Sequence, residues 1–245
     1  MRPKRTNGDK MKSNLQKHYI IFFICLFNHL VAFAAISETE HLRYAVKIDG
    51  KNYTEKMVIH YGKEFIKYTS CGDYTDPEIY EPGGYHCWNI VSTSDFKPLT
   101  IDYYAGPNKM LMTFTKEGHF TMNGIWDGKK LQKNKIFHSQ AYVEITGLVR
   151  TMDLNKKFPA AFDLIRITQF PGLKRHCLKF KTLEDVVVDV PAGRFNCKKL
   201  LLTPTGYKKF FYKAYFYVTT DKRQLVVKVE NVPIGGMSEL IEVSF

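Results

Sequence analysis

The stretch HLRYAVKIDG, residues 41–50, decides the fold class. Its apolar side chains occupy every second position, at Leu42, Tyr44, Val46 and Ile48. Because successive side chains of a β-strand point to opposite faces, this alternation predicts a strand with one buried and one exposed face. Asp49-Gly50 then provides a two-residue hairpin turn. The pattern therefore predicts that a β-hairpin opens the folded part of the chain.

The same period-two pattern recurs along the rest of the chain, with turn residues between the segments. The further expected strands are Lys56–Tyr61, Glu64–Thr69, Leu99–Tyr104, Lys109–Thr115, His119–Asn123, Ala141–Val149, Cys177–Lys181, Val186–Val190, Phe195–Thr203, Phe210–Thr219, Leu225–Glu230 and Glu239–Phe245. Another Asp-Gly turn lies within Ile125–Leu131, at Asp127-Gly128. About a dozen short strands predict an all-β fold, an antiparallel β-barrel or half-barrel built as a meander.

One segment, Pro159–Gln169, has helical spacing. Phe158, Phe162 and Ile165 fall on one face of such a helix, and Pro171-Gly172 follows its end. The sequence therefore predicts one short helix. This helix would either cap an open barrel mouth or cover an edge or face of the sheet.

The composition is that of a globular protein with a substantial core. The chain has 245 residues, of which 44% are hydrophobic and 24% charged, and its mean hydropathy is −0.27. These values exclude a disordered polyelectrolyte and a polytopic membrane protein. The sequence has no coiled-coil heptads, collagen period or longer internal repeat. We expect a single antiparallel β domain over residues 37–245, with a division near residue 150 as the alternative.

Residues 1–34 have the pattern of an export signal. They contain six basic residues and one acidic residue, and the whole chain has a net charge of +12. The apolar run Tyr19–Ile36 follows the basic part. Ala32-Phe33-Ala34 is a small-residue cleavage pattern, so we expect a signal peptide cut after Ala34. An uncleaved signal anchor is the alternative, and the membrane would then be contacted through this segment. This segment therefore predicts an exported protein.

Four cysteines lie beyond the signal segment, an even number for an oxidising compartment. Of the three pairings, the sequence favours the two local ones, Cys71–Cys87 and Cys177–Cys197. Free buried thiols are the alternative. Zinc is disfavoured, because no C-x-x-C pair is present.

The C-terminal part resembles a known family. Pro191-Ala192-Gly193 forms a turn, YVTTDKR follows at Tyr217–Arg223, and Gly235-Gly236 precedes Leu240 in a final apolar strand. Over residues 180–245 this series resembles the exported bacterial family called domain of unknown function 3108. The resemblance implies a mainly antiparallel β-barrel or half-barrel located in the periplasm or cell envelope of a bacterium. It implies no catalytic residues.

The densest candidate site is YKKFFYKAYFY, residues 207–217. On a strand, one face would carry lysines and aromatic rings together: Lys209, Phe211, Lys213, Tyr215 and Tyr217. Such a face can hold an apolar ligand with an anionic head, although a barrel strand between core and surface has the same pattern. With Phe162 and Ile165 of the expected helix, these residues are the candidate ligand-binding set. Nucleic acid is disfavoured as a partner because the protein is expected to be exported.

No catalytic motif, metal-ligand spacing or cofactor-binding sequence is present, so no catalytic residue, metal or cofactor is expected. The leading hypothesis is a non-enzymatic exported β-barrel-like protein that binds a hydrophobic or amphipathic ligand or an envelope partner. A structural or assembly factor that acts by protein–protein contact is the first alternative. An envelope hydrolase with a site built from distant residues is the second.

Overall fold

A computed structural model of the chain describes residues 39–48, 50–72, 86–136, 142, 145–155, 161–168, 172–206, 212–232 and 235–245. Of residues 165–168 and 172–175 it describes the backbone alone. The expected signal segment, residues 1–34, lies outside the described residues, as do Lys209 and Phe211. Thr39–Phe245 form one compact unit.

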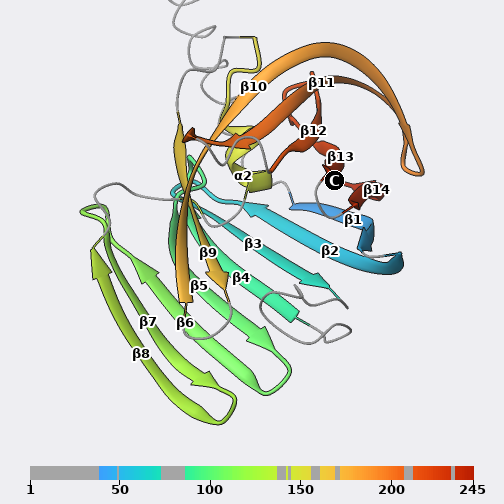
Figure 1. Cartoon of the computed structure of the whole chain (residues 1–245). Coiled ribbons are helices and arrows are strands. Elements are labelled where there is room, and N and C mark those ends of the chain that lie inside the picture. The colour runs from blue at the N-terminus through green and yellow to red at the C-terminus, as the bar shows by residue number, and fades with distance from the viewer. Residues whose placement is uncertain are drawn as a thin grey trace, which may run out of the picture. The chain divides into compact units, whose positions relative to one another are not determined.

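The described strands form one antiparallel sheet of 14 strands, in the order β8-β7-β6-β5-β4-β3-β2-β1-β14-β13-β12-β11-β10-β9 (Figure 1). The strands are β1 (Thr39–Ile48), β2 (Lys51–Tyr61), β3 (Phe65–Gly72), β4 (His86–Thr93), β5 (Pro98–Ala105), β6 (Asn108–Phe114), β7 (His119–Trp126), β8 (Lys129–Ile136), β9 (Phe162–Thr168), β10 (Gly172–Val190), β11 (Gly193–Pro204), β12 (Ala214–Thr219), β13 (Val226–Asn231) and β14 (Gly236–Ser244). The predicted antiparallel meander is confirmed. It is not closed into a barrel, because β8 and β9 are the two ends of the sheet.

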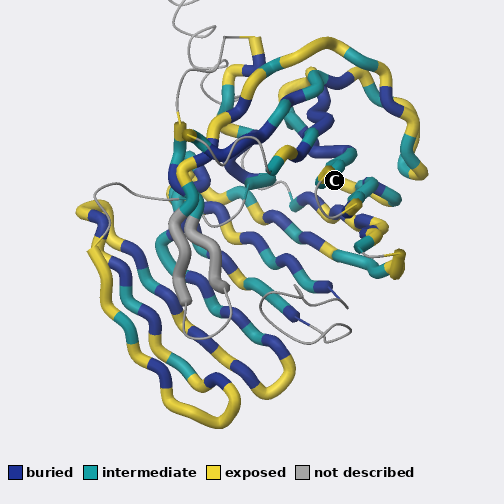
Figure 2. Tube along the Cα trace, viewed as in Figure 1, coloured by how far each residue is buried: buried dark blue, intermediate teal, exposed yellow. Residues whose placement is uncertain are grey.

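The first hairpin forms as its alternation predicts. Leu42, Tyr44 and Val46 are buried while their neighbours along β1 are exposed. Gly50 has a φ of 77°, a conformation that glycine adopts without steric cost, and β2 begins at the next residue. Figure 2 shows the same change between buried and less buried residues along β3 to β7.

Two halves of the meander meet where the first and last strands pair. Strands β1–β8 are joined to β9–β14 by an antiparallel ladder that places His41 opposite Ser244 and Lys47 opposite Met237. A bulge interrupts this ladder between Arg43 and Tyr44. The ends of the described unit therefore lie side by side in the middle of the sheet (Figure 1).

The longest strand, β10, joins two of the expected strands. Cys177–Lys181 and Val186–Val190 both belong to its 19 residues. Its ladder with β11 has a register shift between Thr182 and Asp185. A bulge of this kind lets one strand continue while its side chains change faces.

The helix prediction for Pro159–Gln169 is wrong, because Phe162–Thr168 form strand β9. Residues of β9 lie opposite β10, with Phe162 across from Leu178 and Thr168 across from Gly172. Pairing with a strand that follows in the sequence outweighs a spacing that fits a helix only locally. Pro159 itself lies outside the described residues.

The short helix lies instead at α2 (Ile145–Arg150), so the expected strand Ala141–Val149 is also wrong. Leu148 and Val149 are buried in α2 and pack into an apolar cluster with β10–β13. The sequence analysis also missed β4 (His86–Thr93), a segment to which it assigned no strand.

One of the two expected disulfides forms. Cys71 and Cys87 lie directly opposite each other in the β3–β4 ladder and are bonded. The expected Cys177–Cys197 bond is wrong, because both residues are free cysteines. Although β10 and β11 are neighbours, Cys197 lies opposite Val186, several residues along the ladder from Cys177.

The buried apolar side chains form two clusters. On β1–β8 the larger cluster lies on the face that carries Leu42, Ile59 and Met112, called here the inner face. The registers continue this face from Val46 through Ser238 and Val229 to Phe216, so the smaller cluster lies on the same face of the other half of the sheet.

Helix α2 connects the two clusters. Its Leu148 and Val149 belong to the smaller cluster, and its Gly147 contacts Phe96 of the larger one. Helix α2 thus contacts both halves of the sheet from the inner face.

Candidate functional site

Of the predicted basic and aromatic face, Tyr215 and Tyr217 share one face of β12, and the lysines beside them are Lys199 of β11 and Lys228 of β13. The Lys199 ammonium lies 5.0 Å from the ring centre of Tyr215 and 5.6 Å from that of Tyr217. Glu184 pairs with Lys199 at 3.7 Å, and Lys228 pairs with Glu230 at 3.2 Å and Glu239 at 3.1 Å, all between nitrogen and oxygen. These ion pairs give both lysines a structural role.

Tyr217 belongs to the same network. Its hydroxyl donates a hydrogen bond of 2.9 Å to Glu230. Burial raises the pKa of Tyr217, and the hydrogen bond to Glu230 raises it further. The phenol is therefore neutral near pH 7 and acts as a donor within the sheet.

The candidate set from the sequence is not brought together. Tyr215 and Tyr217 lie on the face of the sheet opposite to the inner face, because the registers connect them through β13 and β14 to Lys47 and Ala45. Phe162 stacks on Phe180 on the inner face, with ring centres 5.6 Å apart. Lys213 is exposed before β12 begins. Ile165 lies in β9, and its side chain is outside the described part of the structure.

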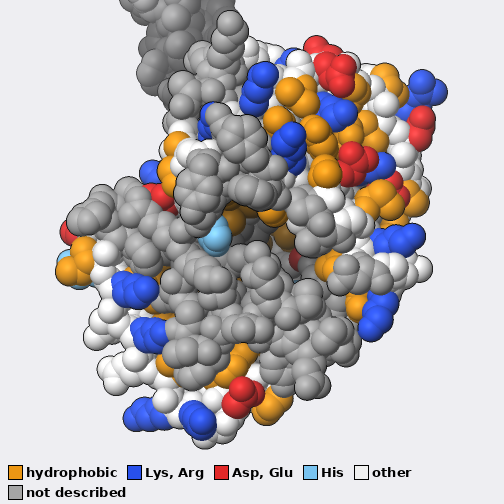
Figure 3. Space-filling model, in the orientation of Figure 1, with side chains coloured by type: hydrophobic (Ala, Val, Ile, Leu, Met, Phe, Trp, Pro, Cys, Tyr) orange, Lys and Arg blue, Asp and Glu red, His pale blue; other side chains and the backbone are white. Residues whose placement is uncertain are grey.

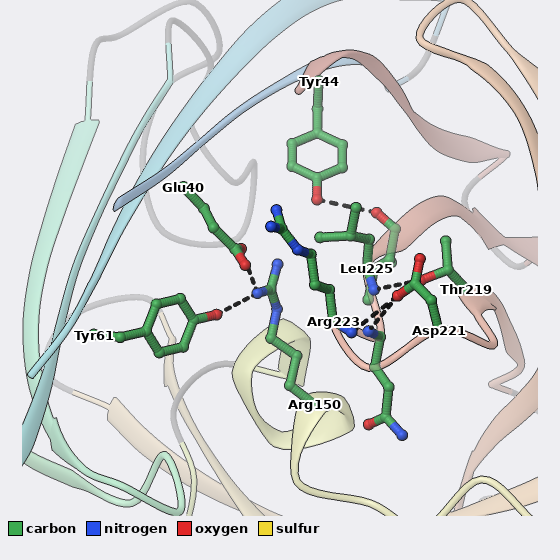
Figure 4. A network of polar contacts seen from close by, with 10 residues as sticks. Glu40, Tyr44, Tyr61, Arg150, Thr219, Asp221, Arg223 and Leu225 are labelled. Carbon is green, nitrogen blue, oxygen red and sulfur yellow. Dashed lines mark hydrogen bonds and ion pairs between the residues drawn. The ribbon is translucent and has the colours of Figure 1, made fainter. Parts of the chain in front are cut away.

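A buried polar cluster that the sequence analysis did not find is centred on Arg150, the last residue of α2 (Figure 4). Helix α2 is held there by Phe96, whose ring packs on Gly147. A Cβ atom at Gly147 would lie 2.4 Å from Cδ1 of that ring, so only glycine allows this approach. Phe96 has a φ of 59° in the turn between β4 and β5, which directs its ring under the helix.

Arg150 reaches from α2 to the inner face of β1 and β2. Its Nη1 lies 2.5 Å from Oε2 of Glu40 and also donates a hydrogen bond to the hydroxyl of Tyr61. The side chains of Arg150 and Glu40 are each only 3% exposed. Such an ion pair is costly to bury, because both groups give up hydration.

Two nitrogens of the same guanidinium have no hydrogen-bond partner among the described residues. These atoms are Nε and Nη2 of Arg150, and both are buried. In a planar guanidinium the N–H bonds of this pair are parallel and form the fork that holds a carboxylate or phosphate with two hydrogen bonds. A buried N–H without a partner costs about 1–3 kcal/mol, and more in a charged group.

The charge on Arg150 persists despite its burial. Burial alone would lower the pKa of the guanidinium, but electrostatic interactions with Tyr61 and Glu40 outweigh this effect and raise the pKa. For Tyr61, burial raises the pKa more strongly than Arg150 lowers it. The cluster therefore presents a cationic fork beside a neutral phenol.

The turn between β12 and β13 places a second arginine near the cluster. Asp221 Oδ1 accepts hydrogen bonds from the backbone nitrogen of Arg223 at 2.9 Å and of Gln224 at 3.3 Å, and from Thr219 Oγ1 at 3.1 Å. Figure 4 shows the Arg223 side chain pointing toward Glu40 and Arg150. Thus the YVTTDKR stretch, part of the family resemblance, forms a turn fixed by its Thr and Asp.

Two further hydrogen bonds join this turn and β13 to the rest of the site. Gln224 Nε2 donates to the carbonyl oxygen of Met152, just after α2, at 2.9 Å. Tyr44 of β1 donates to the carbonyl oxygen of Val226 in β13 at 3.0 Å. Both halves of the sheet and α2 therefore contribute to one site, which explains why no local sequence pattern marks it.

Among the described residues, no cluster of three or more His, Cys, Asp or Glu side chains has a geometry that could hold a metal ion. In the same part of the chain, no helix combines the length and apolarity needed to cross a bilayer.

The fold and the site define an open β-barrel-like protein with a buried arginine. No family model and no curated protein matches the chain. Among solved structures, a β-barrel-like protein of the domain of unknown function DUF1849 from Brucella abortus has a TM-score of 0.51 and 8% identity over 86% of this chain and 99% of that chain. This likeness shows a common fold alone.

Two further solved structures align over most of the chain with lower scores. A candidate exported protein with a YmcC-like fold from Bacteroides fragilis has a TM-score of 0.31 and 12% identity, over 85% of this chain and 96% of that chain. A DUF1329 family protein from Desulfovibrio piger has a TM-score of 0.27 and 12% identity, over 86% and 85%. The resemblance of residues 180–245 to domain of unknown function 3108 stays a prediction.

Proposed function

We propose that this protein is a non-catalytic binding protein of the bacterial periplasm or cell envelope. Its ligand is an amphipathic molecule with a carboxylate or phosphate head, and Arg150 binds that head. The Cys71–Cys87 disulfide is compatible with export, because such bonds persist in oxidising compartments. The expected signal segment at residues 1–34 supports the same location.

The observation that carries this proposal is the fork of Nε and Nη2 on Arg150, which is buried and has no partner in the described part of the chain. Glu40 and Tyr61 use only Nη1. An anionic head with two oxygens would satisfy both remaining donors at once. Hydrogen bonds to charged groups contribute about 1.5–3 kcal/mol each, so the head alone could supply much of the affinity.

The surroundings of the cluster favour an apolar tail on that head. Tyr61 packs against Phe96 edge to face, with ring centres 6.4 Å apart. Ile59 and Leu225 are buried in the larger apolar cluster. Apolar walls around a few polar groups are typical of sites for small amphipathic ligands.

The test compares two probes with the same chain, oleate and oleyl alcohol, on the full-length protein. We expect oleate to bind and oleyl alcohol to bind at least about tenfold more weakly, because the alcohol cannot use the fork. Binding is measured by calorimetry, and retained lipids are identified by native mass spectrometry of protein from the envelope fraction.

The variant Arg150→Met/Glu40→Leu removes the fork and its counter-ion together, so that no buried charge is left alone. We expect this variant to lose oleate binding. The matched control is Arg194→Met/Asp189→Leu, which removes an exposed Arg–Asp pair on β10 and β11. Equal affinity of the unaltered protein for the two probes would refute the proposal. So would full oleate binding by the Arg150→Met/Glu40→Leu variant.

A further inference from the structure

A second feature, distinct from the Arg150 site, lies on the outer face of β5–β8. The strand registers place Tyr104, Lys109, Ile125 and Lys130 in one row across these four strands. Leu111 lies two residues from Lys109 on the same face. Ile125 is 52% exposed and Leu111 is 40% exposed. Together these residues form a basic and apolar patch, called here the β5–β8 patch.

The lysines of the patch carry uncompensated charge within the described structure. Neither Lys109 nor Lys130 makes an ion pair with a described residue. The Lys109 ammonium instead lies 5.2 Å from the ring centre of Tyr104, a cation–π contact that leaves its charge open to an anion. Lys228, by comparison, has two acidic partners.

Strand β8 is the edge strand of the sheet and has no acidic residue. Of its four lysines, Lys130 lies on the face of the patch, opposite Ile125. The other three, Lys129, Lys133 and Lys135, lie on the inner face, opposite buried residues of β7. Figure 3 shows Lys and Arg side chains gathered where Figure 1 places β7 and β8. Lysines on an edge strand prevent pairing with other sheets.

Protection of the edge does not account for the exposed aliphatic side chains beside those lysines. Ile136, the last residue of β8, is 67% exposed, more than Ile125 or Leu111. Aliphatic side chains at an edge favour association, so a surface shaped only to avoid contacts would not carry them. Lysines beside exposed aliphatic groups are instead typical of surfaces that bind the interface of an anionic membrane.

We propose that the β5–β8 patch docks this protein on a membrane surface that contains anionic phospholipid. Lys109 and Lys130 lie at the headgroups, and Ile125 and Leu111 enter the interfacial layer. This contact is additional to any made by residues 1–34, and it does not depend on ligand binding at Arg150.

The experiment is flotation of the purified protein with vesicles of phosphatidylcholine, with or without phosphatidylglycerol. We expect binding only to vesicles with phosphatidylglycerol, and weaker binding as salt is raised. Each lysine near an anionic surface strengthens binding about fivefold, so Lys109→Glu/Lys130→Glu is expected to weaken binding at least about 25-fold. Ile125→Ser is expected to weaken binding without any change in charge.

The matched control is Lys179→Glu/Lys181→Glu, which reverses two exposed lysines of β10 and changes the net charge equally. This control is expected to bind nearly as well as the unaltered protein. An equal loss in the control would mean attraction by net charge alone and would overturn the proposal. Equal binding to both kinds of vesicle, or unchanged binding after Ile125→Ser, would also overturn it.

Discussion

Gly147 is the point at which the position of α2 can be tested most directly. Replacing it by alanine would place a Cβ atom 2.4 Å from Cδ1 and 3.0 Å from Cγ of Phe96. Carbon atoms normally pack about 3.5–4.0 Å apart, so the ring or the helix must move by about 1 Å. The ring has little freedom to do so, because Phe96 is buried and contacts both Tyr61 and Tyr68.

Replacing Gly147 by alanine has two opposing effects on the free energy of unfolding, helix propensity and steric overlap. Alanine stabilises a helix by about 1 kcal/mol relative to glycine. Overpacking in a core costs about 1–3 kcal/mol. Because the contact involves the inner atoms of a confined ring, we expect the clash to prevail. The variant Gly147→Ala should lower the free energy of unfolding by about 1–2 kcal/mol.

The assay is urea denaturation, followed by circular dichroism, in two backgrounds. In the Phe96→Ala background the clash is absent, and Gly147→Ala should be neutral or stabilising by up to about 1 kcal/mol. Phe96→Ala alone should cost about 3–5 kcal/mol. The reasoning fails if Gly147→Ala has the same effect in both backgrounds, because the two residues would then not be in contact.

Three further predictions use the same denaturation assay. Arg150→Met alone should lower the free energy of unfolding by about 3–5 kcal/mol, because it leaves the buried Glu40 carboxylate without its counter-ion, and Arg150→Met/Glu40→Leu should recover most of that loss. Equal stability of the two variants would contradict the ion pair. Cys71→Ser/Cys87→Ser should cost about 3 kcal/mol, since the bond closes a loop with a sequence separation of 16, and a reductant should destabilise the unaltered protein by the same amount and leave this variant unaffected. Burial raises the pKa of the Cys197 thiol from 9.0 to about 12, so the neutral thiol's contribution to the free energy of unfolding is complete below pH 9 and is lost as pH rises toward 12, by up to about 1.4 kcal/mol per pH unit. Cys197→Ala should flatten this decline of stability with pH, and an unchanged slope would show that Cys197 does not cause it.

Local alternation sufficed to predict most strands, because one face of each is buried and the other is not. The first hairpin, β1 and β2, forms at the expected turn. Strand β4 was missed because its sequence follows directly on the turn-rich stretch 71–86, whose residues suggested a loop. Strands β3 and β5 lie on either side of β4, and hydrogen bonding to both of them stabilises an extended conformation that the local sequence does not indicate.

The helix was misplaced because two segments fit either structure locally. Phe162 and Ile165 have helical spacing, but the β-branched side chains of Ile165 and Ile167 also favour a strand. The segment forms a strand because it pairs with β10. At α2 the deciding factor is tertiary, namely burial of Leu148 and Val149 against β10–β13. Neither outcome can be read from a window of a few residues.

The candidate site was even less accessible to sequence reasoning. Arg150, Glu40 and Tyr61 are separated by up to 110 positions, and none belongs to a recognisable motif. Only Arg223 stood within a stretch that the sequence analysis quoted. Arg150 follows the apolar pair Leu148-Val149, but Glu40 stands among polar residues, so no local pattern indicates their contact.

The pairing of β1 with β14 constrains when this protein can complete its folding. Hairpins within each half need only nearby residues, but His41 must wait for Ser244, which lies far along the chain in β14. A polypeptide that leaves the cytosol with its N-terminus first would therefore expose an unsatisfied strand edge until β14 has also been translocated. Contacts of such long sequence separation slow folding and leave the nascent chain open to aggregation. A chaperone that shields β1 during this interval would raise the yield of folded protein without any effect on its final stability.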